Sequence, residues 1–104
     1  MQTIIDFLHR LAANNNREWF TAHKDECKAA QAQFGTWVEG LAQRMAADDP
    51  TLAGLTARDM TYRIYRDTRF SHDKTPYKTH MGAFICRGGR KSGYAGYYFQ
   101  LGAE

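Results

Sequence analysis

The chain has 104 residues, of which 43% are hydrophobic and 24% charged, and its net charge is +3. These values are typical of one small globular domain, and no apolar run reaches the roughly 20 residues that a membrane span needs. The N-terminal stretch has an Asp and a His among its apolar residues and no small-residue cleavage site, so we do not expect it to be a signal peptide. Cys27 and Cys86 stand far apart, so we expect a cytoplasmic chain with reduced thiols and no membrane partner.

The first half of the sequence predicts two helices. Apolar residues recur at helical spacing over residues 3–13, and an Asn-rich triplet ends that pattern. Asn15, followed three residues later by a Glu, has the capping-box spacing that begins a second helix of about 28 residues. Gly35 and Gly40 lie inside it and each costs about 1 kcal/mol relative to Ala, so we expect a bend there.

The second half predicts β-structure. Residues 60–65 alternate apolar and polar positions, as in a strand, which places Tyr62 on the same side as its apolar neighbours. Residues 66–79 lack periodicity and contain a proline, so they are expected to form a loop. Two β-prone runs, 82–86 and 94–101, flank a Gly-rich connection and predict a hairpin.

The resulting fold class is α+β, with two N-terminal helices packed on a small antiparallel sheet. The last predicted strand leaves a sheet edge that no later segment covers. Residues 1–104 are therefore expected to be a single domain or the N-terminal portion of a longer α+β domain. The alternative is that another copy covers the edge, by self-association.

Charge is concentrated in one part of the chain. Residues 58–91 hold nine Lys/Arg against three Asp, a net charge of +6, while the remainder carries −3. Within this part, the basic loop of residues 63–80 interleaves cations with aromatic residues, which favours a site for an anionic, phosphate-bearing ligand. Nucleic acid, a nucleotide and a small phosphorylated metabolite are the candidate partners. The predicted ligand-binding residues are Arg63, Tyr65, Arg66, Arg69, Lys74, Tyr77, Lys78 and His80.

Two other functions compete with anion binding. An enzyme of phosphate or acyl chemistry would use His80 or His72 as the acid–base group, since neighbouring cations lower a histidine pKa, with the arginines as electrostatic stabilisers. A non-enzymatic assembly module would instead use the loop as a structural staple, in which Arg66 pairs with Asp67 or Asp73. No spacing in the sequence is typical of a metal site, a nucleophile or a cofactor fingerprint, so none of these is predicted.

Three blocks of sequence carry a family resemblance. NNNREWF, RIYRDTRFSHDKTPYKTHMGAFI and GGRKSGYAGYYFQL together cover much of the chain, and it closely resembles the bacterial domain-of-unknown-function family 2461, a conserved hypothetical protein family. The resemblance implies no activity, substrate or cofactor, and it implies a further region after the position of Leu101. The family blocks include Arg63, Tyr65, Arg66, Asp67, Arg69, Phe70, Asp73, Lys74, Pro76, Tyr77, Lys78 and His80.

Overall fold

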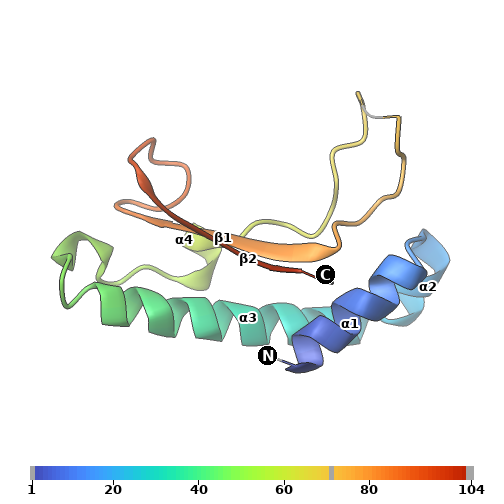
Figure 1. The fold of residues 1–104 in the computed structure, drawn as a ribbon, viewed down its shortest axis with the longest axis horizontal. Helices are drawn as coiled ribbons and strands as arrows, with labels where there is room; N and C mark the ends of the chain where they lie inside the picture. The colour runs from blue at the N-terminus through green and yellow to red at the C-terminus, as the bar shows by residue number, and fades with distance from the viewer. Residues whose placement is uncertain (1, 71, 103–104) are drawn as a thin grey trace.

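The computed structural model describes residues 2–70 and 72–102, and it arranges helices in one layer and a β-hairpin in a second (Figure 1). The elements in chain order are α1 (Gln2–Ala13), α2 (Arg17–Ala22), α3 (Lys24–Met45), the 3-10 turn η1 (Pro50–Leu52), α4 (Ala57–Met60), β1 (His80–Cys86) and β2 (Gly96–Gly102). The predicted α+β class, with N-terminal helices packed on an antiparallel sheet, is confirmed. Among the described helices, none is long and apolar enough to cross a membrane.

The predicted second helix is divided into α2 and α3. Asn16, not Asn15, is the N-cap of α2, and its side chain accepts a hydrogen bond from the Trp19 N–H at 2.8 Å. His23 separates the two helices with φ −116° and ψ 19°, and its ring stacks on Trp19 at 4.0 Å between centroids. The interruption therefore lies at His23, whereas α3 continues without a break through both central glycines.

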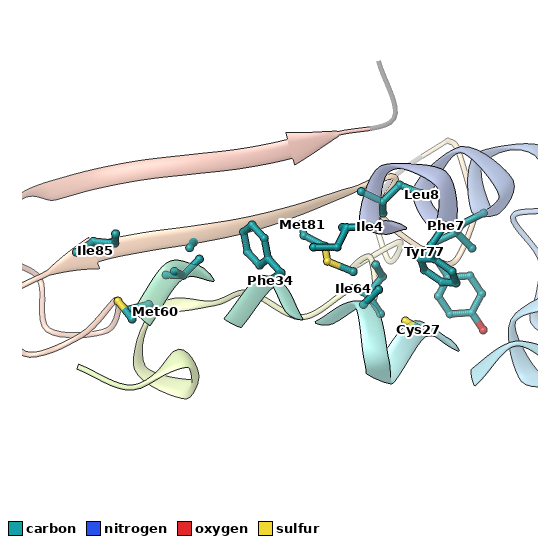
Figure 2. Packing of buried hydrophobic residues seen from close by; sticks show 14 of the residues in the cluster. Ile4, Phe7, Leu8, Cys27, Phe34, Met60, Ile64, Tyr77, Met81 and Ile85 are labelled. Atoms are coloured by element: carbon teal, nitrogen blue, oxygen red, sulfur yellow. The ribbon is translucent and has the colours of Figure 1, made fainter. Parts of the chain in front are cut away.

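The core lies between α3, α1 and β1. Its α3 side chains recur every three or four residues and share one face: Cys27, Ala30, Phe34, Val38 and Ala42. They meet the buried stripe of α1 and the inner face of β1, and Figure 2 shows Phe34 and Met81 between α3 and β1. Each large side chain buried here contributes about 1.5–3 kcal/mol, so this shared stripe fixes how the helices lie on the hairpin.

The strand predicted for residues 60–65 does not form. Thr56 and Asp59 make a capping box, with the Asp59 carboxylate accepting from the Thr56 N–H at 3.0 Å and from its hydroxyl at 2.9 Å. This box starts α4, so Met60 is the last residue of a helix and not the first of a strand.

Residues 61–65 follow as an irregular segment along the free side of β1. It makes two isolated bridges, one of which joins Thr61 to Ala83. Ile64 is buried but Tyr62 is 40% exposed, so the predicted placement of Tyr62 with the apolar side chains is wrong. The error arises because residues 61–65 are not a regular strand, so their side chains do not alternate between two faces.

The predicted hairpin is confirmed as β1 paired with β2, with Phe84 opposite Tyr98. Because side chains alternate along each strand, Met81, Ala83 and Ile85 face the core, and the next residues in each strand face away from the helices. We call that second side the outer face. The described residues of the loop, 66–70 and 72–79, and the turn of residues 87–95 rise on the side of the hairpin away from α3, at its two ends (Figure 1).

Candidate anion-binding site

Arg66, one of the predicted ligand cations, is engaged inside the loop. Its Nη1 lies 3.2 Å from the Asp73 carboxylate and donates to both the carbonyl and the hydroxyl oxygen of Thr75. Asp73 in turn accepts from the Thr75 N–H at 3.0 Å, and these bonds lower the pKa of the Asp73 carboxyl, with the Arg66 charge as a smaller cause. This geometry is the one that the staple alternative predicts.

Two further predicted cations also have partners within the loop. The Arg69 guanidinium contacts the Asp67 carboxylate at 2.9 and 3.1 Å, and its hydrogen bonds lower the pKa of Asp67 to about 2. Lys74 donates from its ammonium group to the Thr68 carbonyl. Both pairs are solvent-exposed, so they order the outer part of the loop more than they stabilise the fold.

A short antiparallel ladder closes the base of the loop. The Arg66 N–H donates to the Pro76 carbonyl at 3.0 Å, and the Lys78 N–H donates to the Ile64 carbonyl at 2.7 Å. These bonds flank the bridge between residues 65 and 77. The ladder brings Lys78 beside the segment that carries Arg63, although the two residues lie at opposite ends of the loop.

Tyr77, between these two bonds, faces the helices. Its backbone N–H and carbonyl both bind the side-chain amide of Asn15, at 3.1 and 2.8 Å. Its ring is only 5% exposed and stacks on Phe20 with 4.0 Å between centroids. Tyr77, predicted as a ligand contact, therefore lies in the core, and Asn15, predicted as a helix cap, anchors the loop.

Three cations converge at the side of the hairpin, and we call Arg63, Lys78 and Arg90 the cation cluster. The Lys78 ammonium lies 5.7 Å and the Arg90 guanidinium 5.5 Å from the centroid of the Tyr62 ring. Arg63 lies over the neighbouring Tyr65 ring at 5.5 Å. Within the part of the chain that the structure describes, none of the three forms an ion pair with a carboxylate. The cluster is therefore an uncompensated concentration of positive charge.

Burial lowers the pKa of Lys78, and the charges of Arg63 and Arg90 lower it further. The same causes act on His80, where burial is the larger cause and the Lys78 charge the smaller, so its pKa falls below 6.5. His80 is therefore neutral near neutral pH, as predicted from its cationic surroundings. His72 is exposed on the loop and lines none of the described depressions that contain His80.

Two backbone contacts hold Arg90 in place. Its N–H donates to the Asp59 carbonyl at 2.8 Å, and its Nε donates to the Thr61 carbonyl at 2.9 Å. The preceding Gly89 has φ +92°, and a Cβ there would lie 3.2 Å from the Asp59 oxygen. A glycine in this position thus allows the hairpin turn to pack against α4. Among the residues that the structure describes, none accepts a hydrogen bond from the two terminal nitrogens of this guanidinium.

The cluster opens into two surface depressions. The larger, of about 490 Å³, is lined by Tyr62, Arg63, Tyr65, Arg66, Asp67, Arg69, Lys78, Arg90 and Lys91. A second, of about 360 Å³, shares Arg63 and Arg90 and extends to Arg58 and the core residues Phe34 and Met81. Among residues 2–70 and 72–102, no group of three or more His, Cys, Asp or Glu side chains is placed to hold a metal ion.

Tyr62 and Arg90 were not among the predicted site residues. The capping-box spacing of Thr56 and Asp59 is a sequence signal that would have placed Tyr62 after a helix. The glycine pair before Arg90 signals a turn, but its packing against α4 is a tertiary contact that no local pattern contains.

Comparison with known proteins supports the resemblance seen in the sequence blocks. No curated protein and no solved structure matches this chain. One family model matches residues 3–104, a span that includes every described element except the first residue of α1, and the whole cation cluster. The chain therefore belongs to the family described as Conserved hypothetical protein (DUF2461).

Proposed function

We propose that the cation cluster binds a phosphate-bearing anion. The observation that carries this proposal is the convergence of Arg63, Lys78 and Arg90 without a carboxylate partner in the described chain. Holding like charges together is unfavourable: burial is the larger cause of the lowered pKa of Lys78, and the charges of Arg63 and Arg90 lower it further. An anion with several oxygens removes the repulsion, because each charge-assisted hydrogen bond contributes about 1.5–3 kcal/mol.

The cations of the basic loop fall into a paired group and an unpaired group, and this supports the cation cluster as the anion site. Arg66, Arg69 and Lys74 already have partners within the loop, so they act as its staple. Arg63 and Lys78, at its base, are joined by Arg90 from the hairpin turn. An arginine presents a planar fork that matches two phosphate oxygens, and a lysine supplies a compact charge beside it.

The test is a titration with inorganic pyrophosphate, followed by NMR of ¹³C-labelled lysine side chains. A bound anion stabilises the charged ammonium, so the pKa of Lys78 is expected to rise on binding. Arg63→Gln should weaken binding at least about tenfold, since it removes one charge-assisted contact. Arg44→Gln changes the net charge equally but lies in the last turn of α3, and it should bind as the natural chain does. Equal weakening by both variants would reduce the site to general surface charge.

General-base chemistry at His80 is a second candidate function. Its support is the lowered pKa of His80 and the position of this ring beside Lys78 in two depressions. Hydrolysis of p-nitrophenyl phosphate and p-nitrophenyl acetate by the natural chain and by His80→Gln tests it. Equal rates for the two chains would remove the enzyme proposal and leave anion binding untouched.

We also propose a bacterial cytoplasmic setting. Cys27 and Cys86 are both buried and free, which suits a reducing compartment. Nucleic acid, nucleotides and phosphorylated metabolites, the candidate partners, are all present there.

A further inference from the structure

We infer that the anion is single-stranded nucleic acid, whose bases stack on tyrosines of the outer face while its phosphates contact the cation cluster. The inference rests on the proposed function and adds a second recognition element to it. Tyr62 and Tyr98 are 40% and 52% exposed, and their ring centroids lie 6.2 Å apart at an angle of 52°. Two large rings side by side on an exposed sheet face are typical of an interaction surface.

The packing over Gly82 indicates that Tyr62 and Tyr98 form one ordered aromatic surface. A Cβ at Gly82 would lie 2.9 Å from the Tyr98 hydroxyl and 3.5 Å from Tyr62, so both rings lean over this residue. The Tyr98 hydroxyl also donates to the Gln100 side chain at 2.9 Å, which fixes its direction. A glycine in the middle of a strand thus leaves room for the tyrosines, and a depression of about 140 Å³ opens between them and Lys78.

Charges and rings alternate along this side of the hairpin. Lys78 and Arg90 lie beside Tyr62, and at the far end, in the turn, Arg87 lies 5.0 Å from the centroid of the Tyr94 ring. Single-stranded nucleic acids are bound in this way, by cations that follow the backbone and aromatic rings that stack on successive bases. Separate depressions are lined by the turn residues Gly88–Lys91, by the cation cluster, and by Tyr62 and Tyr98 with Lys78, and several adjacent sites of this kind favour a polymer over a mononucleotide.

The same geometry disfavours a duplex. In a double strand the bases are stacked on one another and paired, so only phosphates are available to this face. A duplex should therefore bind through the cation cluster alone. An unpaired strand gains about 1–3 kcal/mol for each base that stacks on an aromatic ring.

The test is fluorescence anisotropy with a labelled 12-nucleotide oligo-dT strand, an abasic strand of equal length and a duplex. The oligo-dT strand is expected to bind at least about fivefold tighter than the abasic strand, because only the former can stack. Affinity for both should fall linearly in a plot of log K against log salt. Tyr98→Ser removes one of the two rings, so it should lower oligo-dT affinity at least about fivefold, toward that of the abasic strand, and Tyr98→Phe, which retains the ring, should not.

Tyr97 provides a matched control. It is 57% exposed and adjacent in β2, but it pairs with Ile85 and so points to the opposite side of the sheet. Tyr97→Ser should leave oligo-dT affinity unchanged. Equal losses for Tyr97→Ser and Tyr98→Ser, or equal binding of abasic and oligo-dT strands, would overturn the stacking inference while anion binding stands. Failure to bind any strand, with pyrophosphate still bound, overturns only this inference; failure to bind either overturns both proposals.

Discussion

Gly35 and Gly40 lie in the same helix but in different surroundings. Replacing each by alanine should therefore change the free energy of unfolding differently. Replacing a glycine within a helix by alanine stabilises the helix by about 1 kcal/mol. A Cβ at Gly40 would meet no atom within 4 Å, so Gly40→Ala should raise the free energy of unfolding by that amount. A Cβ at Gly35 would lie 2.8 Å from the Cβ of Ala57 in α4, well inside normal contact.

Gly35→Ala therefore forces α4 away from α3. Overpacking of this kind costs about 1–3 kcal/mol, which cancels or exceeds the gain in helix propensity. The two variants should thus differ by about 1–3 kcal/mol in unfolding free energy, measured by urea denaturation with circular dichroism and an unchanged m-value. Because α4 supplies the Asp59 carbonyl that holds Arg90, Gly35→Ala should also weaken pyrophosphate binding.

A double variant tests the cause. Gly35→Ala combined with Ala57→Gly removes the close contact, so it should be more stable than the sum of the two single changes. Equal stabilisation by Gly35→Ala and Gly40→Ala would refute the reasoning, since it would show that α4 does not pack as closely as the structure indicates. Additive effects in the double variant would refute it as well.

Three further predictions concern single groups. Burial raises the pKa of the Cys27 thiol to about 11, so Cys27 in a Cys86→Ala variant should resist alkylation by iodoacetamide at pH 8 and react only on unfolding; rapid reaction in the native state would contradict this. The pKa of His80 should lie below 6.5, and stability should fall as pH drops through 6.5, because the unfolded chain binds the proton more readily. Lys78→Met should raise that pKa in an NMR titration without fully restoring 6.5, since burial is the larger cause, and an unchanged value would exclude the charge effect. Arg66→Ala should lower the free energy of unfolding by about 1–2 kcal/mol and make the loop more susceptible to proteolysis, but leave pyrophosphate affinity nearly unchanged. A folded variant that no longer binds pyrophosphate would show that Arg66 is a ligand contact.

The helices and the hairpin could be predicted because their information is local. The apolar spacing of α1 and α3, and two β-prone runs around a Gly-rich turn, each lie within one stretch of sequence. The division at His23 was missed because apolar positions continue at helical spacing across it. The strand at residues 60–65 was predicted wrongly because α4 is only four residues long, too short to show a period.

The candidate site could be predicted in part. The sequence located the positive charge and offered the pairing of Arg66 with Asp73 as one alternative, and that pair is present. It did not indicate which cations remain unpaired, because that depends on how the turn with Arg90 packs on α4. Tertiary contacts, and not local sequence patterns, determine which cations are paired within the loop and which join Arg90 in the cation cluster.

The Asn15 amide has a consequence for how copies of this chain meet. The Tyr77 N–H and carbonyl face away from the loop ladder, and both are hydrogen-bonded to the Asn15 side chain. The amide thus makes the two hydrogen bonds that a neighbouring strand would make. An unpaired backbone edge is a template for intermolecular β-pairing, and a side chain that satisfies both groups removes it. β2 pairs only with β1 among the strands that the structure describes. The base of the loop is therefore protected from edge-to-edge association between copies of the chain.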